Sequence, residues 1–120
     1  MKKDWKISVL LDLYGKLFLT DKQYKVVDLY YNADLSLSEI AQQEAITRQG
    51  VRDSIKRGEI ALIEAEEKLK FYEKQLEAEK IRESVVKSAN LIIENCQGSK
   101  VIEKYAMNII SCMSRLEEQE

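Results

Sequence analysis

Proline and histidine are absent from this chain of 120 residues, and glycine occurs only four times. With so few residues that break helices or form tight turns, the composition favours long helices. The absence of histidine removes the commonest general acid–base catalyst. No 18 apolar residues follow one another, and the first residues lack the apolar core of a secretory signal. We therefore expect an all-α cytoplasmic protein that does not insert into membranes.

Cysteine is also scarce and occurs only at positions 96 and 112. Cys96 and Cys112 form no CxxC pair, and no histidine is present to complete a zinc site. We expect both to be reduced thiols that pack as small apolar side chains. Glycine-rich phosphate loops, GxSxG turns and carboxylates at metal-binding spacing are also missing. These absences predict a protein that is not an enzyme and needs no cofactor or metal.

Apolar residues are present at helical spacing from the first residues onward. Between Trp5 and Leu17 they recur at steps of three and four, which predicts a first helix. Residues Thr20 to Gln23 have the form of a capping box, in which the hydroxyl and the amide side chain bind the first backbone amides of a helix. A second helix should therefore begin there and end at Asn32 to Asp34.

Two further helix starts lie close together in residues 36–57. Ser36 to Glu39 form another capping box, and Thr47 is a good N-cap for the segment that follows. Two short helices joined by three or four residues predict a helix-turn-helix, whose second helix reads the major groove in DNA-binding proteins. Small Ala41 suits the close crossing of these helices. The wedge between them should be filled by Ile40, Ile46, Val51 and Ile55.

Residues 48–57 carry four cations and one aspartate, a local charge of 4 − 1 = +3. With Val51 at zero on a helical wheel, Ile55 lies at about 40° and Gln49, Arg52 and Lys56 lie between about 100° and 160°. This arrangement is expected of a DNA-reading helix, although any solvated surface helix would also show a polar face. The candidate nucleic-acid-binding residues are Arg48, Gln49, Arg52, Lys56 and Arg57.

Three segments, at residues 19–23, 29–41 and 47–57, resemble the bacterial YlxM family. The resemblance extends from about residue 5 to residue 77, and we expect the rest to be a distinct extension. It implies a helix-turn-helix fold similar to region four of sigma factors, and a regulatory role in the signal recognition particle pathway. The chain departs from the family pattern at Ala45, which replaces the usual glycine of the turn, and at Gly50 and Arg52, which replace alanine and tyrosine. If the turn requires positive φ, alanine there costs roughly 1 kcal/mol.

A heptad pattern begins at Val51, with steps of four and three residues, and no helix-breaking residue follows between Glu59 and Lys80. We expect the recognition helix to run on for about 30 residues, roughly 45 Å, with a possible break only near residues 80–84. Its stripe should pack on the C-terminal helices or pair with a second copy. The seam comprises Val51, Ile55, Gly58, Leu62, Ala65, Leu69, Tyr72 and Leu76.

Two amphipathic segments complete the chain, from Ile81 to Cys96 and from Ile102 to Leu116. Gly98 and Ser99 between them have the form of a helix stop followed by a helix cap, which predicts a helical hairpin. We expect a helix-turn-helix domain at 1–58, followed at 59–120 by the long helix and the hairpin as a dimerisation region.

Charge weighs against the nucleic-acid hypothesis, because residues 59–80 hold four lysines and seven glutamates, 4 − 7 = −3, and the whole chain has a net charge of −2. Two hypotheses therefore stay open. In the first, the chain is a homodimeric regulator that binds DNA or RNA through the five candidate residues. In the second, it is an interaction module that binds components of the signal recognition particle without binding DNA. A purely structural adaptor is a third.

Overall fold

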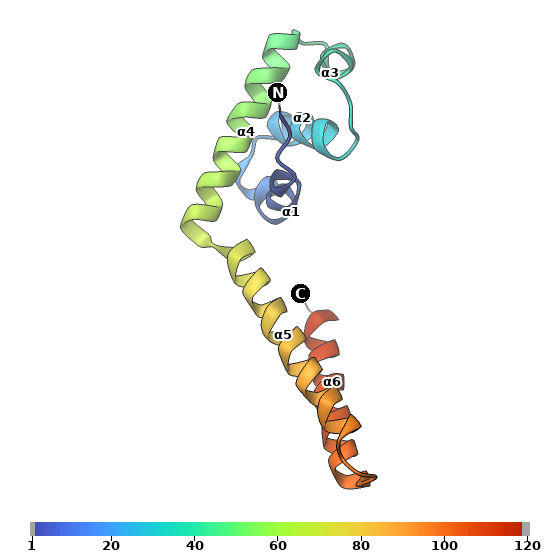
Figure 1. The fold of residues 1–120 in the computed structure, drawn as a ribbon. Coiled ribbons are helices and arrows are strands. Elements are labelled where there is room, and N and C mark those ends of the chain that lie inside the picture. Colours follow the sequence, from blue (N-terminus) through green and yellow to red (C-terminus); the bar gives the residue numbers. More distant parts are fainter. Residues whose placement is uncertain (1, 119–120) are drawn as a thin grey trace. The chain divides into compact units, whose positions relative to one another are not determined.

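The computed structural model describes residues 2–118, and these residues form six helices (Figure 1). The all-α fold class is confirmed. Contacts divide the chain after Glu73 into two compact units. The helices are α1 (Lys6–Phe18), α2 (Asp21–Tyr31), α3 (Leu37–Glu44), α4 (Arg48–Leu69), α5 (Phe71–Glu94) and α6 (Lys100–Glu118).

The first unit packs α1, α2 and α3 against one side of α4 (Figure 1). Its core is a continuous apolar cluster to which all four helices contribute. Gly58 lies where α4 meets α2, and a Cβ added there would stand 2.8 Å from a methyl group of Val27. The fully buried large side chains are Ile7, Leu10, Leu11, Tyr14, Val26, Val27, Ile40, Val51, Ile55 and Leu62.

The predicted helix starts are confirmed. Thr20 and Ser36 each accept a hydrogen bond from the backbone three residues later, and the Gln23 and Glu39 side chains accept from the cap backbone in return. Thr47 Oγ1 accepts from the Gly50 amide at 2.9 Å. These hydroxyls satisfy amides that would otherwise lack a partner at the helix start.

The turn between α3 and α4 requires positive φ at the position where this chain has alanine in place of the family's usual glycine. Ala45 ends α3 with φ 55° and ψ 43°, in the left-handed region. Its amide donates to the Ala41 carbonyl, and so does the Ile46 amide, at 3.1 Å. The turn therefore forms with alanine, at the conformational cost expected for a residue with a Cβ.

The expected continuous helix from Thr47 to Lys80 is wrong, because α4 ends at Leu69. Lys70 adopts a left-handed conformation, with φ 56°, and α5 begins at the next residue. Residues 80–84, where a break was considered, lie inside α5. The expected domain boundary after residue 58 also differs from the observed one, because Leu62 and Ala65 of α4 are buried in the core of the first unit.

The heptad seam consequently has a different partner from the two that were expected. Its members from Val51 to Ala65 are buried in the cluster formed with α1, α2 and α3. Leu69 and Leu76 are exposed. The seam thus holds the first unit together and needs no second copy.

The second unit contains the helical hairpin predicted from Gly98 and Ser99. Gln97 and Gly98 both have positive φ, and the Ile102 amide donates to Ser99 Oγ at 3.4 Å. Cys96 and Cys112 are free thiols of intermediate exposure.

Candidate nucleic-acid interface

The first turns of α4 separate an anchored side from an exposed side. Val51 and Ile55 are both 0% exposed and belong to the core cluster. The opposite side carries Arg52 and Lys56, which are exposed. Because the apolar side is fixed against three helices, the cationic side chains project away from the domain. All five residues proposed from the sequence are exposed, namely Arg48, Gln49, Arg52, Lys56 and Arg57.

The cations on this surface are not neutralised within the described residues 2–118. No ion pair or hydrogen bond among these residues engages the side chains of Arg48, Arg52, Lys56 or Arg57. Gln49 differs, since its Nε2 donates to Asp53 Oδ1 at 3.0 Å. That bond also occupies the one carboxylate of the segment. Four guanidinium and ammonium groups are therefore available to an anionic partner.

Arg57 lies on a different side of α4 from Lys56, since successive residues are about 100° apart on a helix. It borders a depression of about 420 Å³ between α4 and the start of α2. Lys22 lines the same depression, and sequence reasoning missed it because the packing of α2 on α4 brings it there. The other lining residues are Thr20, Gln23, Gly50, Asp53 and Ser54.

An ion pair joins α2 and α3, the two helices that precede α4. Lys25 Nζ lies 3.2 Å from Glu44 Oε1, which links α2 to the last residue of α3. The two atoms are within ion-pair distance but are not aligned as a hydrogen bond, since Glu44 Oε1 has no hydrogen-bond partner in the described part of the chain. Glu44 lies immediately before the left-handed turn, so this contact helps to hold the end of α3 against α2.

Two of the seven glutamates of residues 59–80, whose charge weighs against nucleic-acid binding, point into the first unit. Glu59 Oε1 accepts from the Tyr31 hydroxyl at 2.7 Å, and burial together with this hydrogen bond raises the pKa of Tyr31. Glu66 is buried and accepts from the Tyr14 hydroxyl at 2.7 Å. The acidic face that α4 presents to solvent is therefore weaker than its composition indicates.

Comparison with known proteins agrees with this architecture. Residues 1–105 match the family model of YlxM / p13-like helix-turn-helix proteins, UPF0122. The match includes α5 and the start of α6, so the expectation that the resemblance ends near residue 77 is wrong. Helices beyond the first unit are part of the family pattern.

Individual relatives are similar over nearly their whole length. A UPF0122 protein of Clostridium kluyveri is 39% identical over 112 residues, which cover 92% of this chain and 100% of the relative. One from Desulforamulus reducens is 46% identical over 106 residues, 87% of each chain. One from Bacillus cereus is 40% identical over 108 residues, 87% of this chain and 97% of the relative. The chain belongs to the UPF0122 family of YlxM / p13-like helix-turn-helix proteins.

Proposed function

We propose that this protein is a non-enzymatic, cytoplasmic regulator that binds nucleic acid through the cationic side of α4. One observation carries the proposal: Arg52 and Lys56 are exposed and unpaired within the described residues, while Val51 and Ile55 on the opposite side are 0% exposed. Arginine and lysine held in this way can contact phosphates and guanine edges. Arg48 and Gln49 lie in the first turn of α4. In helix-turn-helix proteins the N-terminal residues of the recognition helix contact the bases.

The second cationic group, Arg57 with Lys22, supports contact with the backbone of the nucleic acid. It borders the depression between α4 and α2. Phosphate contacts from helices beside the recognition helix fix its register in the groove. We assign these two residues to phosphate contact.

Removal of two cations from the candidate surface tests the proposal. We expect Arg52→Ala with Lys56→Ala to weaken binding to a labelled duplex of about 20 base pairs by about tenfold or more in low salt, measured by fluorescence anisotropy. Lys68→Ala with Lys80→Ala is the matched control, because it removes the same charge from exposed positions elsewhere. Equal losses in both pairs would show a general charge effect and contradict a specific surface on α4.

The alternative function is an interaction module that binds components of the signal recognition particle without binding DNA. It is favoured by the net charge of −2, which is unusual for a strong nucleic-acid binder. Pull-down from a lysate with and without nuclease distinguishes the two. Capture that survives nuclease treatment supports the alternative, and capture that is lost supports binding through nucleic acid. Parallel arms with duplex DNA and with RNA identify the ligand class.

We further propose that the protein acts as a homodimer, in which two copies of α4 can contact the same nucleic acid. The buried seam of α4 no longer supports this, but the exposed apolar residues of α5 and α6 do. A particle mass of twice 13.9 kDa is expected in solution.

A further inference from the structure

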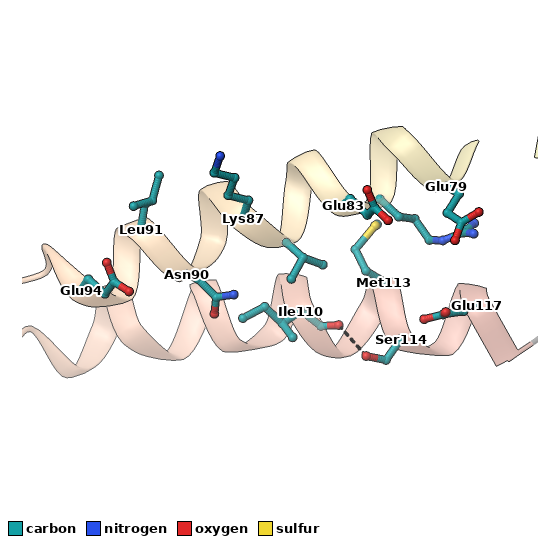
Figure 2. A pocket seen from close by; sticks show the side chains of 12 residues that line it. Glu79, Glu83, Lys87, Asn90, Leu91, Glu94, Ile110, Met113, Ser114 and Glu117 are labelled. Carbon is teal, nitrogen blue, oxygen red and sulfur yellow. Dashed lines mark hydrogen bonds between the residues drawn. The ribbon is translucent and has the colours of Figure 1, made fainter. Parts of the chain in front are cut away.

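The α5–α6 hairpin leaves most of its large apolar side chains uncovered. Among the described residues of the second unit, only Ala89 and Ala106 are buried. The two helices run side by side, and a groove of about 630 Å³ lies between them (Figure 2). A hairpin with only two buried alanines has a very small core. Because helices in proteins gain most of their stability from packing, we expect this hairpin to be stabilised by a further contact.

The groove occupies one side of the hairpin and is bordered by charged residues. Glu79, Glu83, Glu94 and Glu117 line its edges together with Lys87 (Figure 2). Figure 2 also shows Ile110 and Met113 of α6 between the two ribbons. This side therefore has charged groups along its rim, while Val86 and Leu91 also line the groove.

The other side is apolar, and we call it the hairpin face. None of its members lines the groove. On α6 the members follow the heptad steps 3, 4, 3, 4 from Ile102 through Tyr105, Ile109 and Cys112 to Leu116. Taking Ala89 and Ala106 as the facing positions of the two antiparallel helices, the α5 members and the α6 members project to the same side of the hairpin. The exposed members are Ile81 58%, Ile92 42%, Val101 64%, Ile102 45%, Tyr105 66%, Ile109 37% and Leu116 49%.

Area and charge together indicate what covers this face. From their exposed fractions, the members of this face offer on the order of 600 Å², about three quarters of the roughly 800 Å² that each partner contributes to a standard interface. An apolar patch of that size lies at the upper end of what monomers expose, and such patches often mark interaction sites. Among residues 81–116 the face carries no charged residue, and the α6 charges Glu103, Lys104 and Arg115 point elsewhere on the helical wheel. Lys74 and Glu77 of α5 project to the same side but lie before this range. An uncharged face with heptad spacing is complementary to itself, as a two-fold interface requires.

We propose that two copies of this chain pair through the hairpin face, so that two α5–α6 hairpins form a four-helix bundle. The proposal deepens the homodimer put forward above by locating its interface, and it does not depend on what α4 binds. In such a bundle the apolar stripes of all four helices are directed into a shared core. The charged groove side of each hairpin stays in water.

The experiment compares two glutamate variants of the full chain by size-exclusion chromatography with light scattering at micromolar concentration. Tyr105 and Met107 are both exposed on α6, at 66% and 55%, but they lie about 160° apart around the helix. We expect wild type and Met107→Glu to have twice the monomer mass, and Tyr105→Glu to have the mass of one chain. Circular dichroism checks that helix content is retained.

Other outcomes overturn the inference in distinguishable ways. A Tyr105→Glu variant that stays dimeric, or a Met107→Glu variant that becomes monomeric, removes the face as the interface. A monomeric wild type removes the homodimer as well, while nucleic-acid binding measured on the same sample stands or fails separately. If Tyr105→Glu loses helix content, Ile92→Ser on α5 provides the test, with an increase of at least tenfold in the dimer dissociation constant expected and no increase contradicting the proposal.

Discussion

At the residue scale, Ala45 determines how α3 meets α4. Its left-handed conformation lets the amides of Ala45 and Ile46 bind the Ala41 carbonyl, which ends α3 and redirects the chain toward Thr47. A Cβ makes this conformation unfavourable by about 1–2 kcal/mol. Glycine has no such cost in the folded state but gains more freedom in the unfolded chain.

Ala45→Gly should therefore increase the free energy of unfolding by about 0.5–1 kcal/mol, measured by urea denaturation. Ala61→Gly is the matched control, because Ala61 lies within α4, where glycine costs about 1 kcal/mol. Opposite signs for the two variants are expected. If Ala45→Gly is as destabilising as Ala61→Gly, the left-handed turn does not exist in solution.

Residues with a partner three positions away were predictable from sequence. The hydroxyls of Thr20, Ser36 and Thr47 bind amides in the adjacent turn, so each helix start depends on local residues alone. Lys22 was not predictable as part of the candidate interface. Its place beside Arg57 depends on how α2 packs on α4.

At the element scale, the junction between α4 and α5 is held by one buried carboxylate. Glu66 accepts hydrogen bonds from the backbone amides of Tyr72, at 3.0 Å, and Glu73, at 3.1 Å, which are the first amides of α5. The Tyr14 hydroxyl donates to Glu66 and accepts from the Phe71 amide at 3.0 Å. Burial raises the pKa of Glu66, but these hydrogen bonds outweigh it and hold the pKa below the ordinary 4.5.

The pKa of Glu66 is lower in the folded state than in the unfolded chain, so the ionised carboxylate stabilises the folded state. This contribution to the free energy of unfolding is present above the unfolded-state pKa of about 4.5 and is lost as the pH falls from there toward the folded-state pKa. We expect Glu66→Gln to reduce the free energy of unfolding at pH 7 by about 1–3 kcal/mol and to flatten its decline in acid. Denaturation across this pH range is the measurement. Glu67→Gln, at an exposed neighbouring position, should behave like wild type. An unchanged acid profile in Glu66→Gln would contradict the role of Glu66 at the junction.

The break at Lys70 could not be predicted because its cause is tertiary. Neither lysine nor phenylalanine stops a helix, and the heptad pattern continues through Tyr72. The hydroxyl that completes the junction belongs to Tyr14, 52 residues before Glu66. Periodicity correctly identified the apolar residues of α4 but not the helices that cover them.

At the scale of the whole molecule, the charge distribution is compatible with the proposed nucleic-acid interface despite the net charge of −2. The local charge of residues 48–57 is 4 − 1 = +3, and it is exposed. Glu59 and Glu66 are directed toward Tyr31 and Tyr14 within the first unit. A small number of phosphate contacts is therefore expected, with a modest dependence of binding on salt.

The most direct test of the cationic surface is the slope of the logarithm of the binding constant against the logarithm of salt concentration, measured by anisotropy for wild type and for the Arg52→Ala, Lys56→Ala double variant. Each lost phosphate contact should reduce the magnitude of the slope by about 1, so a reduction of up to about 2 is expected. The Lys68→Ala, Lys80→Ala control should keep the wild-type slope. The same slope in all three proteins, or no binding by wild type to DNA or RNA at low salt, would contradict nucleic-acid binding through α4.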